Sequence, residues 1–253
     1  MGKLIDIPFE EESQDIKNRV TNYWSKRAQG FFEMRQDELK SNKADRWLAE
    51  FERATEGRKG LNILDIGCGA GFFEALLGQA GHKVTGIDLT LDMVTKANQM
   101  IKDYGLDTTD VKAMVMDAEN PQFENETFDI IITRNLTWTL PHPIEAYQKW
   151  YNILKPAGIL LNFDAEYAKG AHNLKQPENI AHRLISDELK DECHEIYHML
   201  TISNLNRPQW DHAILNEIGF SQVHIDETFS SRIFKEHDEF YIPDHMFMIK
   251  AIK

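Results

Sequence analysis

Residues 62–90 constrain the fold of this chain more than any other segment, because they predict a strand, a glycine-rich turn, a helix and a second strand in that order. Residues 63–66 form a short, mainly apolar run that is typical of a parallel strand buried on both faces. The second strand, at 83–87, leads directly into Asp88. This order predicts a βαβ unit and therefore an α/β fold with a parallel sheet.

Glycine occupies every second position of the turn, at Gly67, Gly69 and Gly71. Glycine suits a turn where the backbone bends tightly and a ligand comes close. A dinucleotide-binding fingerprint requires its third glycine at position 72, where this chain has Phe72, so an NAD-dependent oxidoreductase is disfavoured. At the tip of the second strand, Asp88 is placed to accept hydrogen bonds from both hydroxyls of a ribose.

The motif Asp65-Ile66-Gly67-Cys68-Gly69-Ala70-Gly71 closely resembles the first motif of class I methyltransferases that depend on S-adenosylmethionine (SAM). This resemblance implies a Rossmann-like fold with helices on both faces of a seven-stranded, mostly parallel sheet whose last strand is antiparallel. It also implies that the glycine turn holds the methionine half of SAM and that Asp88, followed by Leu89, holds the ribose. The product would be S-adenosylhomocysteine (SAH).

The segment 135–167 strongly resembles the ubiquinone-biosynthesis-like branch of this family, also described as methyltransferase type 11, with Ala157 where a second glycine is usual. We expect a turn at 155–158 and a fifth strand at 159–163. The resemblance covers about 45–167 and 208–253, where a hairpin of two strands is expected to complete the sheet.

Two further strand ends are expected to contribute to the SAM site. A strand at 111–116 precedes Asp117 and Ala118, which occupy the family positions that bond the adenine amino group and lie beside its ring. The alternative is that Asp117 only caps the following turn. Asn135 follows the strand at 128–133, and ligands of open α/β sheets bind at this edge, so Asn135 is a candidate to contact SAM near its sulfur.

Residues 13–53 are predicted to be helical, with a break or bend at Gly30. In related enzymes such a segment closes over the SAM pocket. The aromatic rings of Tyr23 and Trp24 suit a sulfonium cation, and Arg27 suits the methionine carboxylate. The alternative is that this aromatic stripe only packs against the sheet.

The residues proposed to contact the methyl acceptor are His142, Asp164, Glu166 and Tyr167. The last three lie at the end of the fifth strand. Methyl transfer is an in-line displacement, so alignment of the nucleophile matters most, and no residue is assigned as general base. Each of these side chains is equally compatible with ordinary polarity at the rim of a pocket.

We expect one methyltransferase domain over 1–253. It would comprise an N-terminal helical cap at 1–55, a SAM-binding core at 56–167, an inserted helical lid at 168–206 and a closing helix and strand hairpin at 207–253. The insertion is predicted to be helical over 178–203 and to shape the acceptor pocket.

One motif in this insertion suggests a different chemistry. His194-Glu195-Ile196-Tyr197-His198 matches the H-E-x-x-H helix of zinc proteases, and Glu217 is far enough along the chain for a third ligand. The extended form of the motif is absent, and the match lies in a segment inserted into another predicted fold. A zinc-dependent hydrolase and a non-catalytic protein that binds SAM or SAH remain the alternatives, and no metal is predicted.

The net charge and the cysteine content indicate which binding partners and which cellular compartment to expect. The chain has 41 acidic and 28 basic residues, for a net charge of −13, which disfavours a general nucleic-acid binder or an anionic membrane surface. The acidic balance therefore favours a neutral or cationic small molecule as the acceptor over a nucleic acid. Two distant cysteines and a first segment unlike a signal peptide indicate the cytoplasm. The oligomeric state is not predicted.

Overall fold

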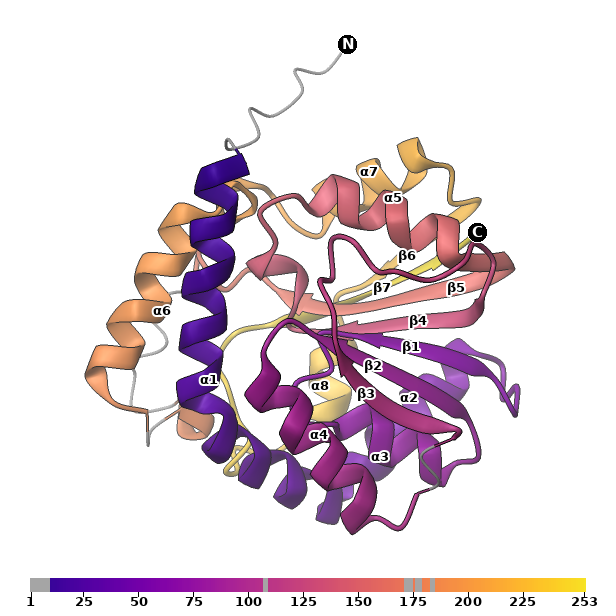
Figure 1. Ribbon diagram of the computed structural model, residues 1–253, viewed down its shortest axis with the longest axis horizontal. Coiled ribbons are helices and arrows are strands. Elements are labelled where there is room, and N and C mark those ends of the chain that lie inside the picture. The colour runs from indigo at the N-terminus through magenta and orange to yellow at the C-terminus, as the bar shows by residue number, and fades with distance from the viewer. Residues whose placement is uncertain (1–9, 107–108, 171–174, 176–178, 183–184) are drawn as a thin grey trace.

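The computed structural model describes residues 10–106, 109–170, 175, 179–182 and 185–253 (Figure 1). Its centre is a seven-stranded sheet with the strand order β3-β2-β1-β4-β5-β7-β6. The strands are β1 (Asn62–Ile66), β2 (Lys83–Asp88), β3 (Val111–Val115), β4 (Phe128–Arg134), β5 (Leu154–Ala165), β6 (Gln222–Asp226) and β7 (Met246–Ile252). The first five pair in parallel, and β7 is antiparallel to both β5 and β6. This topology confirms the predicted mostly parallel sheet with an antiparallel last strand.

Helices cover both faces of the sheet, as predicted. The helices are α1 (Glu10–Lys40), α2 (Asn42–Ala54), α3 (Phe72–Gln79), α4 (Leu91–Asp103), α5 (Pro143–Ile153), α6 (Asp187–Met199), α7 (Gln209–Ile218) and α8 (Phe229–Ile233). Helices α5 and α7 lie on one face, and α2, α3 and α4 lie on the other (Figure 1). None of the helices that the structure describes combines the length and the apolar character that a bilayer crossing requires.

The central strand β1 explains why both faces need helices. Ile63 packs in one core cluster with Trp47 of α2, whereas the next residue, Leu64, packs in the other with Trp150 of α5. Successive side chains of a strand point to opposite faces, so an apolar run such as this is buried on both sides. Both residues are fully buried.

Helix α1 is continuous through Gly30, so the predicted break at this residue is wrong, whereas Figure 1 shows the C-terminal part of α1 turning away from the direction of its N-terminal part. Ala28 and Phe32, on either side of Gly30, are buried in a cluster with Met93 and Met100 of α4. A glycine inside a helix costs only about 1 kcal/mol, which this packing outweighs. In Figure 1, α1 runs beside α6 and past the carboxyl ends of the parallel strands.

Two other boundaries differ from prediction. Strand β5 begins at Leu154, so 155–158 belong to the strand, and its pairing with β4 shifts register between Phe128 and Ile130. This irregularity absorbs the residues expected to form a turn, with Ala157 at a positive φ of 61°. The helix predicted over 178–203 is shorter: α6 begins after Ser186, whose side chain accepts a hydrogen bond from the Leu189 N–H. Residues 176–178 and 183–184 lie outside the described part.

Candidate functional site

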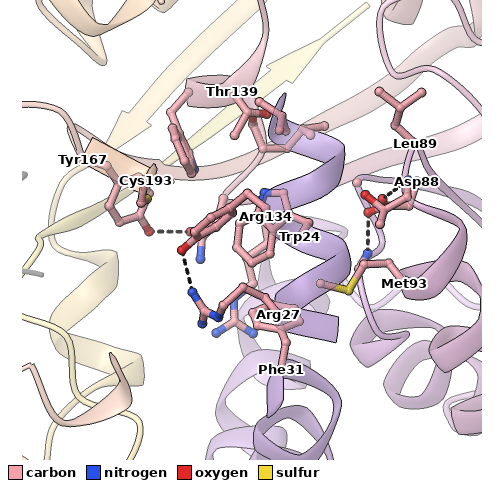
Figure 2. Close-up of a pocket in the computed structure, with 18 of the residues that line it drawn as sticks. Trp24, Arg27, Phe31, Asp88, Leu89, Met93, Arg134, Thr139, Tyr167 and Cys193 are labelled. Atoms are coloured by element: carbon pink, nitrogen blue, oxygen red, sulfur yellow. Dashed lines mark hydrogen bonds between the residues drawn. The ribbon is translucent and has the colours of Figure 1, made fainter. Parts of the chain in front are cut away.

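A cavity lies between the inner face of α1 and the carboxyl ends of the parallel strands (Figure 2). Predicted cofactor residues that line it are Gly67, Gly69, Asp88, Leu89, Asp117, Ala118, Asn135, Tyr23, Trp24 and Arg27. Segments far apart in the sequence therefore meet at the edge where open α/β sheets bind ligands. Asp65, Cys68 and Gly71 are not among the residues that line this cavity.

Backbone hydrogen bonds hold the glycine turn against β2. The N–H groups of Gly67 and Cys68 both donate to the Ile87 carbonyl, at 2.8 and 3.0 Å. Gly69 has a φ of 53°, and a Cβ added there would lie 3.0 Å from Cε1 of Phe31 in α1. Glycine is needed at this position because α1 packs directly on the turn.

Asp88 is fixed by two backbone donors. Its Oδ2 accepts from the Gly69 N–H at 3.0 Å, and its Oδ1 accepts from the Thr90 N–H at 2.8 Å (Figure 2). Burial raises the pKa of this carboxyl, although the two N–H groups act in the opposite direction. Two carboxylate oxygens offer about four acceptor positions, so this side chain retains the capacity to bind two ligand hydroxyls.

Asp117 both caps a turn and lines the cavity. Its Oδ1 accepts from the Glu119 N–H at 2.9 Å, as the capping alternative predicts. Its Oδ2 lies 2.7 Å from Nζ of Lys17 in α1, and this ammonium also lies 2.5 Å from Glu119. The neighbouring Ala118 is buried and lines the same part of the cavity.

The side chains of α1 combine the two roles that the sequence left open. The rings of Tyr23 and Trp24 pack edge to face at 5.1 Å, and both line the cavity. The Arg27 guanidinium donates to the Tyr23 hydroxyl at 2.7 Å and lies 5.5 Å from the centre of the Trp24 ring. These contacts place a buried cation and two aromatic faces in one wall.

A buried ionic cluster beside the cavity was not predicted. Glu38, fully buried, accepts hydrogen bonds from Arg35, from Arg134 at 2.9 Å and from the Trp47 indole at 3.0 Å. Burial alone would raise the pKa of Glu38, but the two guanidinium groups outweigh burial and lower it to about 2. The sequence signal for part of this cluster is the spacing of Arg35 and Glu38, three residues apart on one helix.

The other half of the cavity is largely aromatic and draws on the C-terminal part of the chain. Tyr167, predicted to contact the acceptor, donates to Oδ1 of Asn135 at 2.7 Å. Burial is the main reason that the pKa of Tyr167 lies well above its ordinary value, so its hydroxyl stays protonated. Other residues that line this half are Trp138, His182, Cys193, Tyr197, Phe234, Phe240, Ile242, Asp244 and Met246.

The remaining acceptor candidates lie outside the cavity lining and bond to protein groups. Asp164 is fully buried, accepts from the Trp138 N–H at 3.0 Å and pairs with Arg207 at 2.8 Å. Glu166 accepts from the Arg207 N–H at 3.0 Å. His142 bonds to the Ser13 hydroxyl at 2.9 Å.

Asp65 lies beneath the glycine turn, together with the fully buried Glu74 of α3. Burial and the nearby Asp88 raise the pKa of Asp65 to about 8, and burial with the Asp65 charge raises that of Glu74. Both carboxyl groups hold protons at neutral pH, because burial outweighs the more distant charge of Arg134 and neither group forms an ion pair with a described residue. Asp65 therefore supports the turn from behind.

The His194, Glu195 and His198 side chains of the H-E-x-x-H segment are exposed on α6. Nε2 of His194 and Nε2 of His198 lie 3.2 Å apart. Within the described residues, no three His, Cys, Asp or Glu side chains come together as a metal site would require. A catalytic zinc ion needs three protein ligands, so the geometry gives the zinc-hydrolase alternative no support.

Comparisons with known proteins agree with this arrangement. A family model described as a methyltransferase domain matches residues 64–162. The ubiquinone biosynthesis O-methyltransferase of Actinobacillus pleuropneumoniae serotype 5b is 30% identical over 115 residues, which are 45% of this chain and 49% of the relative. The protein of the same name from Glaesserella parasuis serovar 5 is 29% identical over 177 residues, which are 60% and 74% of the two chains. Apart from the Glaesserella protein, the chain spans about half the length of these ubiquinone-biosynthesis relatives.

Solved structures share the whole fold. The plantazolicin methyltransferase BamL, solved with a triazolic desmethylPZN analogue and SAH, superposes with a TM-score of 0.63 at 18% identity, covering 97% of this chain and 99% of that one. A SAM-dependent methyltransferase from Aquifex aeolicus gives a TM-score of 0.55 at 18% identity, covering 85% and 92%. At such identities the likeness establishes the fold alone.

Proposed function

We propose that this chain, which contains a methyltransferase domain and has the class I methyltransferase fold, transfers a methyl group from SAM to a small-molecule acceptor. The observation that carries the proposal is the cavity at the carboxyl edge of the sheet, in which Asp88 is held by the glycine turn. A half-buried carboxylate with free acceptor capacity beside a close-approach turn fits the ribose and methionine of SAM.

We assign the three parts of SAM, its ribose, adenine and methionine, to three groups of residues along the cavity. Asp88 and Leu89 would hold the ribose, and Asp117 and Ala118 the adenine. The methionine half would lie over Gly67 and Gly69, near Asn135. When bound, SAM supplies an electrophilic methyl group on a sulfonium sulfur. Asp65, Cys68 and Gly71 would then act from outside the cavity by shaping the turn.

The protein would promote transfer by positioning and by excluding water. Tyr23, Trp24 and Arg27 line the cavity, and the proposed N-terminal cap (1–55) that carries them would close it opposite the proposed core (56–167). The lid (168–206) and the C-terminal segment (207–253) would form the acceptor half. Tyr167, which stays protonated, would donate hydrogen bonds there rather than act as a base. Alignment within a closed, largely aromatic site suits in-line displacement.

A small molecule suits this site better than a nucleic acid, because the site is a cavity with several aromatic side chains in its walls and the chain carries a net charge of −13. Both cysteines are free and buried, which is compatible with work in the reducing cytoplasm.

The direct test is turnover. The protein is incubated with methyl-labelled SAM and a fractionated extract of small metabolites, and SAH formation and label transfer are measured. We expect SAH to accumulate together with a labelled small molecule. SAM binding with no turnover in any fraction would instead favour the non-catalytic SAM-binding alternative.

A further inference from the structure

We infer that the acceptor is a small organic acid with an aromatic or apolar body, whose carboxylate is bound by Arg27 and Arg35 in the half of the cavity away from Asp88. This inference rests on the proposed function. It concerns the chemistry of the acceptor, which the comparisons leave open, and it departs from the neutral or cationic acceptor that the net charge of −13 favours.

The first argument is charge. Three arginine side chains line the cavity: those of Arg27, Arg35 and Arg134. Arg35 and Arg134 share a single carboxylate, Glu38, and Asp244 also lines the cavity. The remaining lining acids, Asp88 and Asp117, lie in the cofactor half, where Lys17 neutralises Asp117. A surplus of positive charge in a buried site favours an anionic ligand.

Arg27 shows the surplus most clearly. It is 9% exposed, and in the described part of the chain its guanidinium donates one hydrogen bond, to Tyr23, and forms no ion pair. A guanidinium carries five N–H donors and binds carboxylates through two of them at once. Burying a guanidinium costs free energy unless an anion pairs with it. Because Arg27 lies on the cavity wall, a bound ligand can supply that anion.

Two buried nitrogen atoms that face no protein acceptor or donor support the same site. Nε of Arg134 and Nδ1 of His182 both have no hydrogen-bond partner among the described residues, and both side chains line the cavity. Burial, together with Arg27 and Arg35, lowers the pKa of His182 to about 3, so its ring stays neutral. The buried polar groups of this half are therefore incompletely satisfied by the protein.

The cofactor accounts for only part of the positive charge. Ile66 pairs with Thr133 across β1 and β4, so Arg134 follows directly beside Gly67, the expected place of the methionine carboxylate. We therefore assign to Arg134 the contact with the methionine carboxylate that the sequence suggested for Arg27. Figure 2 shows Tyr167 and Cys193 on one side of Trp24, and Asp88 and Leu89 on the other. Arg27 and Arg35 then remain for the acceptor.

Aromatic side chains in the same half of the cavity suit an acceptor whose non-acidic part is aromatic or apolar. Its walls are the rings of Tyr167, Tyr197, Trp138, Phe234 and Phe240, which form face and edge contacts with flat apolar groups. A carboxylate on an aromatic or apolar body would therefore match the arginine side chains and the rings together.

The test uses paired probes on the SAH-saturated protein. Benzoate, phenylacetate and indole-3-acetate are titrated against their primary amides, which have nearly the same shape without the charge. Binding is followed by calorimetry and by the shift in thermal midpoint. We expect the acids to bind and their amides to bind at least about tenfold more weakly, the scale of a charge-assisted pair.

Arg27→Gln should remove the preference for acids over amides while SAH affinity stays within about twofold of the wild type. The control Lys26→Gln, on the exposed side of α1, should change neither the preference for acids nor the SAH affinity. Amides that bind as well as acids, or no binding by either series, would overturn the inference and leave the SAH result standing. An Arg27→Gln protein that loses SAH affinity and still prefers acids to amides would also overturn the inference. The paired titration of the wild type decides the matter if the variant does not fold. Failure of the wild type to bind SAH would overturn the proposed function, and the inference with it.

Discussion

Lys17 in α1 lies 2.7 Å from Asp117, the carboxylate that follows β3 a hundred residues later in the chain. The same ammonium contacts Glu119, so one lysine joins the N-terminal cap to two acids at the predicted adenine end of the cavity. Desolvation on its own would lower the pKa of Lys17, but the two carboxylates reverse this and raise it. This contact fastens α1 over the site.

The substitution Lys17→Met should loosen that closure. We expect SAH to dissociate several-fold faster, because α1 must move aside for release, and stability to fall by only about 1 kcal/mol, since the pair is partly exposed. Stopped-flow displacement of SAH measures the rate. Lys26→Met, exposed on the same helix, is the matched control, and equal dissociation rates in both variants would show that Lys17 does not control closure.

Glu38→Gln should strongly destabilise the protein, because it leaves Arg35 and Arg134 buried without their shared carboxylate. Loss of one partner of a buried pair typically costs about 3–5 kcal/mol. Chemical denaturation at neutral pH measures this, with the exposed Glu33→Gln as control. A loss no larger than that of Glu33→Gln would contradict this account of the cluster.

The same cluster predicts acid sensitivity. The pKa of Glu38 is lowered to about 2, so its contribution to stability is present above its ordinary pKa, and is lost as the pH falls from there towards 2. The wild type should therefore lose more stability than Glu38→Gln between about pH 5 and pH 3. If the free energy of unfolding depends on pH in the same way in both proteins, Glu38 is not the cause of the acid sensitivity.

The buried acids beneath the glycine turn predict the opposite dependence. The folded protein keeps a proton on Asp65, whose pKa is about 8, that the unfolded chain releases near pH 4. The contribution of this group to stability therefore falls as the pH rises between those values and is constant above them. In Glu74→Gln, an amide N–H next to Asp65 can stabilise its ionised form.

We expect Glu74→Gln to lose less stability than the wild type between about pH 5 and pH 8. Urea unfolding at several pH values measures the slope, with the exposed loop variant Glu124→Gln as control. A slope unchanged from that of the wild type would show that the pair is not responsible.

Local sequence patterns were enough to predict the part of the site near β1 and β2. Gly67, Gly69 and Asp88 lie within one βαβ unit, where a strand, a turn and the next strand determine their placement. The sheet topology followed from the same pattern and from the family resemblance. These features depend on interactions between residues that are near in sequence or in adjacent strands.

Local sequence patterns did not predict the long-range ion pairs. Nothing in the sequence indicates that Lys17 meets Asp117, or that Arg134 meets Glu38, because each pair joins segments about a hundred residues apart. Asp164 illustrates the converse: its position at a strand end suggested substrate contact, yet Arg207 from a distant segment binds it in the core. Strand-end position indicates location, whereas burial and partners depend on the whole fold.

Calorimetric titration with SAM and with SAH tests the central claim most directly. The wild type and Asp92→Asn, an exposed neighbour with the same charge change, should bind both ligands in the micromolar range. Asp88→Asn should bind them more weakly by about 1–3 kcal/mol, the scale of a lost buried polar partner, while remaining folded by circular dichroism. Absence of binding by the wild type, or equal binding by a folded Asp88→Asn protein, would contradict the account.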